Sequence, residues 1–165
     1  MEKVLQTLNS LVEDGVLGQY AIGGAMAAMF YAEPVMTFDL DVFVVLPHQG
    51  LLITLTPLYD ALQKRGYEAQ GECVNIEGVP VQFLPAYNPL LEEALKEAEE
   101  KLYQEQIPTW VLRVEHLIAI CLQTGREKDK DRVRHFCNEA QINMEYLQGI
   151  LKQHGLEEKW LLWKI

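Results

Sequence analysis

Apolar residues in the first third of the chain change their spacing repeatedly, and each change predicts a new element. Helical spacing predicts a first helix over residues 2–14, carried by Val4, Leu5, Leu8, Leu11 and Val12. A short apolar strand over 20–22 then leads into a glycine pair and a helix of small residues over 25–31. An apolar run rich in β-forming residues predicts a second strand over 37–46.

The middle of the chain predicts a helix, a hairpin and a second helix, in that order. Helical spacing over residues 58–65 ends at a glycine, and two short strands, 73–76 and 79–84, follow. Glu77-Gly78 joins these strands and resembles the dipeptides of tight hairpin turns. The charged stretch over 89–105 predicts an acidic helix with a solvated face.

The last third of the chain is predominantly helical. An extended segment at 108–112 leads into three predicted helices, which cover residues 114–120, 128–139 and 143–153. Together the elements predict an α/β (α+β) fold, a small mixed sheet flanked by helices and followed by a helical subdomain. We expect residues 1–106 to form the α/β domain and residues 107–165 to form the helical subdomain packed on it.

Two glycines and two carboxylates are the residues most indicative of chemistry. Gly23 and Gly24 precede the small-residue helix, and Asp39 and Asp41 lie one residue apart on the second strand. Side chains alternate along a strand, so both carboxylates emerge on one face about 7 Å apart. Such a pair can hold Mg²⁺, which completes its coordination with water and substrate phosphates. Backbone N–H groups at a helix start favour the same phosphates.

The same four residues also have a purely structural interpretation. The glycines can serve only to turn a strand tightly into a helix, and the aspartates can lie on the polar face of an edge strand. Apolar residues on both faces of the strand beyond Asp41 instead favour burial. Neighbouring carboxylates at a buried strand are costly unless a cation meets them, so we expect a metal or nucleotide site.

The order of these motifs, a glycine pair, a short helix and D-x-D on a strand, resembles the nucleotidyltransferases of the DNA polymerase β-like superfamily. A closer likeness is to AbiEii-type toxins and minimal nucleotidyltransferase-like bacterial proteins. The resemblance implies transfer of a nucleoside monophosphate from an NTP to an unknown acceptor, with Mg²⁺ or Mn²⁺ as cofactor. It implies that Asp39 and Asp41 are catalytic and hold the metal, and that Gly23 and Gly24 hold the phosphates.

A second match to the superfamily lies in the helical half, over residues 113–133. The pattern G-R-x-K-D-x-x-D is matched at Gly125, Arg126, Lys128 and Asp129. The place of its second acid falls at Arg132, next to Asp131. The resemblance implies that Arg126 and Lys128 contact the triphosphate, since arginine binds phosphate bidentately and lysine supplies a compact charge. The alternative is a solvated helix start stabilised by charges of alternating sign.

Two positions depart from the superfamily pattern. The third carboxylate that transferases usually carry on a later strand is replaced by Gln82. Glutamine offers a metal one neutral oxygen and cannot act as a general base, so Gln82 is a weakened third catalytic position. Many relatives carry a lysine in the helix where this chain has Cys121, and a buried thiol there is typical of inert packing.

Composition and charge limit the classes of partner that the protein can bind. The net charge of −10 over 165 residues argues against a broad nucleic-acid surface, although a local basic pocket for one nucleotide is compatible with it. No apolar run is long enough to span a membrane. Three widely spaced cysteines are typical of reduced thiols, and we expect a cytoplasmic protein.

Two functions from different classes follow. The first is the metal-dependent nucleotidyltransferase that the resemblance implies. The second is a catalytically degenerate protein of the same fold that binds a nucleotide or a partner protein, which would account for Gln82 and Cys121. Some relatives are toxins that modify tRNA or a partner protein, so a toxin–antitoxin or defence role with a protein partner or a tRNA-like acceptor is compatible with either.

Overall fold

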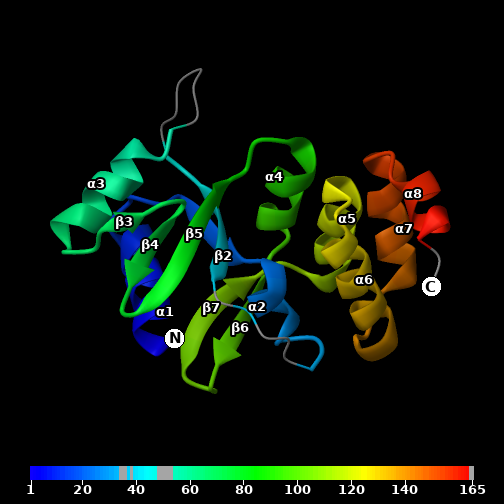
Figure 1. The fold of residues 1–165 in the computed structure, drawn as a ribbon, viewed down its shortest axis with the longest axis horizontal. Coiled ribbons are helices and arrows are strands. Elements are labelled where there is room, and N and C mark those ends of the chain that lie inside the picture. The colour runs from blue at the N-terminus through cyan, green and yellow to red at the C-terminus, as the bar shows by residue number, and fades with distance from the viewer. Residues whose placement is uncertain (34–36, 38, 48–53, 164–165) are drawn as a thin grey trace.

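A mixed sheet with helices on both faces forms the frame of the protein. The computed structural model describes residues 1–33, 37, 39–47 and 54–163. Within them, seven strands lie in the order β3-β4-β5-β2-β1-β7-β6. The strands are β1 (Gln19–Ile22), β2 (Leu40–Val45), β3 (Ala69–Gln70), β4 (Cys73–Ile76), β5 (Val79–Pro85), β6 (Glu99–Tyr103) and β7 (Ile107–Val111). The sheet and its helices are shown in Figure 1.

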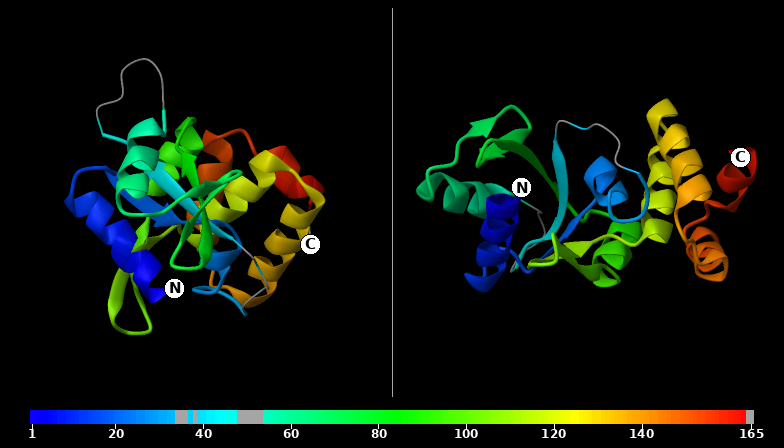
Figure 2. Two further views of the ribbon diagram at one scale, coloured as in Figure 1. Left: turned by 60° about the vertical axis from the view of Figure 1, so that its left-hand side comes forward. Right: turned by 90° about the horizontal axis from the view of Figure 1, so that it is seen from below.

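Helices cover both faces of this sheet. Helix α1 (Glu2–Glu13) packs on β1 and β7, and α4 (Pro89–Lys96) packs on β1 and β2. The view from below in Figure 2 places α1 and α3 (Thr56–Lys64) on one side and α2 (Gly24–Ala28) with α4 on the other. The core between these layers is aliphatic, because the inward positions of the strands and the apolar stripe of α1 are fully buried.

The central strand β2 sets the register of the sheet. It pairs antiparallel with β1 and parallel with β5. In the parallel pair, Asp41 lies opposite Gln82 and Phe43 lies opposite Leu84. Since side chains alternate along strands, these four residues share one face of the sheet, the face on which α2 and α4 lie. The register therefore brings the D-x-D strand and the strand of Gln82 side by side.

Four more helices follow the last strand of the sheet. These are α5 (Val114–Thr124), α6 (Glu127–Glu139), α7 (Met144–Gln153) and α8 (Glu157–Leu162). Helix α5 joins this group to the sheet half, because it packs on α4 as well as on α6 and α7. Strand β7 pairs within the sheet, so the all-helical part begins at Val114. The division into two domains stays a prediction.

Most predicted elements are confirmed, and one is partly wrong. The Glu77-Gly78 turn has positive φ at both residues, 52° and 84°, as tight hairpin turns require. The predicted strand over 37–46 is observed as Leu40–Val45, with Phe38 outside the described residues. The predicted helix over 89–105 is wrong in its second half. Residues 99–103 form strand β6, which pairs antiparallel with β7 at the sheet edge.

A buried polar cluster connects α4 to the helical half. The carboxylate of Glu93 on α4 contacts the ring nitrogens Nε2 of His154 at 2.8 Å and of His116 at 3.3 Å. It also accepts a hydrogen bond from Gln153. The His116 ring is fully buried, and its Nδ1 has no hydrogen-bond partner among the described residues. Burial therefore lowers the pKa of His116, despite the opposing influence of Glu93.

The cluster predicts that acid destabilises the protein. Burial alone would raise the pKa of Glu93, but hydrogen bonds from His154 and His116 outweigh it and lower that pKa. Both Glu93 and His116 thus have folded-state pKa values below their unfolded values, so the unfolded chain binds more protons. We expect the free energy of unfolding to fall as the pH drops from about 6.5, the ordinary pKa of histidine, to about 5.5, because the unfolded chain then binds a proton that the buried His116 ring does not. Urea unfolding across this pH range tests it. The loss should shrink in His116→Phe, and equal loss in both proteins would contradict the assignment.

Candidate functional site

A cleft of about 800 Å³ lies between the sheet half and the helical half. Strands β2 and β5 form one wall, the small residues of α2 form a second, and α5 with the start of α6 forms the third. Six of the seven predicted site residues line it, namely Gly24, Asp39, Asp41, Gln82, Arg126 and Lys128. Residues more than 100 positions apart in the sequence therefore meet in one cleft.

The two aspartates form its acidic wall. Asp39 is exposed just before β2, and its Oδ1 accepts a hydrogen bond of 3.0 Å from Thr37. Asp41 is half-buried, and no described residue donates a hydrogen bond to its carboxylate. Burial raises the pKa of Asp41, and the neighbouring charge of Asp39 raises it further. Arg132, Lys128 and Arg126 across the cleft partly oppose this shift. The positive charges around an ionised Asp41 therefore do not fully compensate for its burial and for the charge of Asp39.

The glycine pair brings the backbone against these carboxylates. Gly24 begins α2 with φ +58°, a left-handed conformation that glycine adopts readily. A Cβ atom at Gly24 would overlap Oδ2 of Asp41, so no larger residue fits while Asp41 keeps its position. Gly23 does not line the cleft; its N–H donates to the Asp41 carbonyl at 2.9 Å, and its missing side chain makes room for Phe43. Both glycines therefore lie in direct contact with Asp41.

Gln82 takes the position beside Asp41 on β5, and its amide is oriented by a further carboxylate. Nε2 of Gln82 donates to Oε2 of Glu72 at 3.3 Å. A carboxylate only accepts hydrogen bonds, so the amide must present its NH₂ group to Glu72 and keep its carbonyl oxygen as the acceptor. The carboxylate that contacts the Gln82 side chain therefore belongs to Glu72, an exposed residue that precedes β4.

Arg126 is held by Asp129. The guanidinium of Arg126 donates to both carboxylate oxygens of Asp129, at 2.8 and 3.1 Å. Asp129 is fully buried and also accepts from the Arg126 backbone N–H and from Thr124 Oγ1. These bonds cap the start of α6. Lys128 is exposed and makes no ion pair with any described residue. All donors of Lys128 are therefore free of the described carboxylates, whereas Arg126 commits two of its five to Asp129.

Arg132 is the cleft residue that the sequence analysis missed. It lies one helical turn after Lys128 on α6 and lines the same cleft. Its side chain is 21% exposed, and Nη1 lies 3.8 Å from Oδ1 of Asp129. The i, i+4 spacing of Lys128 and Arg132 places both cations on one helix face, and that spacing is visible in the sequence.

The donor chemistry of the cleft fits a hard divalent cation. Asp39 and Asp41 offer carboxylate oxygens, and Gln82 can add a neutral carbonyl oxygen. The described residues contain no group of three or more His, Cys, Asp or Glu side chains arranged to hold a metal ion. An ion here would therefore depend on water and substrate oxygens for much of its coordination, as Mg²⁺ commonly does.

Comparison with solved structures identifies the architecture. A nucleotidyltransferase-like antigenic protein from Paracoccidioides brasiliensis matches 82% of this chain and 73% of its own, with a TM-score of 0.57 and 16% identity. The antibiotic-resistance factor ANT(2'')-Ia matches 98% of this chain and 96% of its own, with a TM-score of 0.51 and 16% identity. The chain has a nucleotidyltransferase-like fold. No protein-family model and no curated protein matches its sequence.

In this nucleotidyltransferase-like fold, Cys121 lies in the cleft wall on α5. Its side chain is buried, and burial raises the pKa of the thiol to about 12. The thiol is therefore uncharged at neutral pH and supplies neither a nucleophile nor a cation. The predicted burial of Cys121 is confirmed. None of the described helices has the length and hydropathy needed to cross a bilayer.

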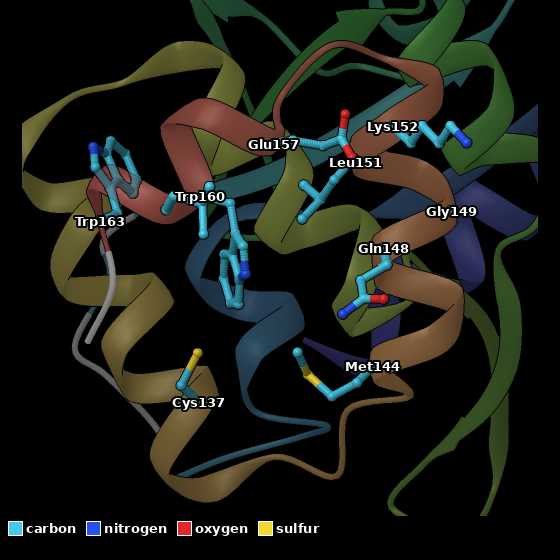
Figure 3. A pocket seen from close by; sticks show the side chains of 10 residues that line it. Cys137, Met144, Gln148, Gly149, Leu151, Lys152, Glu157, Trp160 and Trp163 are labelled. Carbon is cyan, nitrogen blue, oxygen red and sulfur yellow. The ribbon is translucent and has the colours of Figure 1, made fainter.

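A second cavity of about 690 Å³ lies within the helical half of the nucleotidyltransferase-like fold, among α6, α7 and α8. Figure 3 shows Cys137, Met144 and Trp160 around it. Among the described residues, its lining contains a single acid, Glu157, and a single base, Lys152. It lacks the paired carboxylates and facing cations of the first cleft, so the first cleft is the candidate functional site.

Proposed function

We propose that the protein is a Mg²⁺- or Mn²⁺-dependent nucleotidyltransferase that transfers a nucleoside monophosphate from an NTP to an acceptor. The observation that carries the proposal is the half-buried Asp41. It lies beside Asp39, accepts no hydrogen bond from the described residues, and faces cations across the cleft. A divalent ion bound to an NTP would supply the charge that Asp41 lacks, and the opposite wall would supply donors for the phosphates.

In this proposal each wall of the cleft has one task. Asp39 and Asp41 would hold the metal ion, with Gln82 as a weak third ligand. The bound ion would neutralise phosphate charge and polarise the phosphoryl group under attack. Lys128 would bind the polyphosphate, and Gly24 would let the backbone approach it. Arg126 would contribute its charge and its remaining donors, because Asp129 holds only two of its five guanidinium donors.

A degenerate protein of the same fold is the second candidate, and Gln82 favours it. Gln82 lies in register with Asp41 but cannot take a proton from an incoming acceptor. A protein that binds a nucleotide without transferring it needs no such base. The likeness to AbiEii-type toxins belongs to this part of the proposal, since a toxin–antitoxin context would provide a protein partner or a tRNA-like acceptor.

Thermal unfolding with each of the four NTPs, with and without Mn²⁺, tests the nucleotide site. A ligand present at one hundred times its Kd stabilises the folded state by about 2.7 kcal/mol, which corresponds to about 8 °C in a chain of this size. We expect such a shift for at least one NTP, dependent on Mn²⁺ and lost in Asp39→Asn. The absence of any shift in the wild type would contradict both candidates as nucleotide binders.

Label transfer then separates the two candidates. With an NTP labelled at the α-phosphate, a transferase moves the label to an acceptor in a lysate or to the protein itself. A wild-type protein that shows the Mn²⁺-dependent shift but transfers no label in either setting would support the degenerate candidate.

A further inference from the structure

Four basic side chains line the cleft, and two of them are already bound within the protein. Arg126 is engaged by both oxygens of Asp129. The ring of His135 contacts the backbone carbonyl of Glu33 through Nε2 at 2.9 Å and the carboxylate of Glu139 through Nδ1 at 3.2 Å. Arg126 commits two of its five guanidinium donors to Asp129, and its side chain is 55% exposed. The two basic side chains of the cleft that make no hydrogen bond to a described carboxylate both lie on α6.

These two side chains, Lys128 and Arg132, differ in their surroundings. Lys128 is exposed at the start of α6, whereas about four-fifths of the Arg132 side chain is covered. The only carboxylate within ion-pair distance of Arg132 among the described residues is Asp129, at 3.8 Å. That separation is too long for a hydrogen bond, and Asp129 is already occupied by Arg126 and Thr124. The guanidinium of Arg132 also interacts with the thiol of Cys121 on α5. Arg132 keeps its remaining donors free in a partly desolvated position.

Arg132 also faces the acidic wall. Of the three cations that act on the carboxyl group of Asp41, Arg132 has the strongest influence, ahead of Lys128 and Arg126. An anion placed in the cleft would therefore lie between Arg132 on one side and the Asp39–Asp41 pair on the other. A polyphosphate carrying a divalent ion meets both walls, because its metal ion attracts the carboxylates and its oxygens accept from the guanidinium.

We propose that Arg132, supported by Lys128, is the principal polyphosphate-binding residue of the cleft. This inference rests on the proposed function, and it assigns the phosphate contact to a position where the superfamily pattern has an acid. The planar guanidinium would bind two oxygens of the polyphosphate at once, and its partial burial would strengthen those charged hydrogen bonds.

Calorimetric titration with inorganic triphosphate and Mn²⁺ tests the proposal, with Mn²⁺ alone as a separate titration. We expect Arg132→Gln to bind triphosphate roughly tenfold to a hundredfold more weakly, which is the range for losing hydrogen bonds to a charged group. Affinity for Mn²⁺ alone should stay unchanged. The matched control is Arg134→Gln, since Arg134 lies on the same helix, does not line the cleft and pairs with Asp131. Arg134→Gln should bind triphosphate as the wild type does.

Three outcomes would overturn the inference. If Arg132→Gln binds triphosphate as tightly as the wild type, Arg132 is no phosphate contact, although the proposed function stands. If the variant instead gains Mn²⁺ affinity and keeps its triphosphate affinity, Arg132 is a counter-ion for Asp41. If the wild type binds neither Mn²⁺ nor triphosphate, the proposed function fails as well. Arg132→Lys keeps the positive charge but loses the planar guanidinium that can bind two oxygens at once. If Arg132→Gln does not fold, an intermediate triphosphate affinity of Arg132→Lys supports the inference and an unchanged affinity contradicts it.

Discussion

Asp41→Asn should raise the melting temperature of the metal-free protein and abolish its response to Mn²⁺. Burial and the charge of Asp39 raise the pKa of Asp41, so the folded state favours the neutral carboxyl. Above that raised pKa, the ionised group opposes folding, and asparagine removes the charge with little change in shape. We expect a gain of about 1 kcal/mol, or about 2–4 °C, from neutralising a partly buried charge that lies beside a like charge.

Thermal unfolding at pH 7.5, with and without Mn²⁺, measures both parts of this prediction. The control is Asp60→Asn, which removes the same charge from an exposed residue of α3. The control should leave the melting temperature and the Mn²⁺ response nearly unchanged. A fall in melting temperature for Asp41→Asn would mean that the carboxylate stabilises the fold, and the metal site would lose its main support.

Asp129→Ala should destabilise the protein strongly, by about 3 kcal/mol. The carboxylate is fully buried and accepts hydrogen bonds from Thr124 Oγ1 at 2.7 Å and from the backbone and side chain of Arg126. These bonds hold the pKa of Asp129 below its usual value, against the effect of burial. Alanine removes the cap of α6 and leaves these donors without their acceptor.

Urea unfolding gives the free-energy difference for Asp129→Ala directly. The matched control is Asp131→Ala, two residues later on the same helix, where the side chain is 75% exposed and, within the described part of the chain, pairs only with Arg134. Exposed pairs of this kind contribute less than about 1 kcal/mol. Comparable losses in the two variants would show that the hydrogen bonds of Asp129 are not what stabilises the start of α6.

The elements that the sequence predicted well are those whose causes are local. Helix α1 follows from an apolar stripe at helical spacing, and the β4–β5 hairpin follows from Glu77-Gly78, where only a tight turn connects two short strands. The predicted helix over 143–153 begins at a local cap, because the side chain of Asn143 accepts from Tyr146 N at 3.1 Å. In each case the residues that decide the structure lie within a few positions of one another.

Strand β6 was mistaken for helix because its cause is distant. Its composition is that of a charged helix, and Glu99, Lys101 and Tyr103 show their alternation only against β7. Glu99 also forms an ion pair with Arg113, which lies beyond β7. Pairing at a sheet edge and a long-range ion pair therefore override a helical composition.

The candidate site likewise has some features with local causes, which the sequence predicts, and others with distant causes, which it does not. D-x-D spacing along one strand predicts that Asp39 and Asp41 share a face, and the register of β2 and β5 was needed to bring Gln82 beside Asp41. The capture of Arg126 by Asp129 is local, three residues apart, but the sequence alone does not show that Asp129 is buried. The roles of Asp39, Asp41 and Gln82 stay predictions until metal and nucleotide binding are measured.

The close approach of Gly24 to Asp41 has a consequence for how related sequences diverge. A side chain at position 24 would collide with the carboxylate at position 41. Glycine at 24 therefore cannot be replaced while aspartate stays at 41. A lineage that lost the chemistry would be released from this constraint only in part. A shorter residue at 41 would remove the worst overlap, but its Cβ would still lie 3.0 Å from a Cβ at 24, and position 24 would keep its left-handed backbone. This chain has kept both halves of the pair.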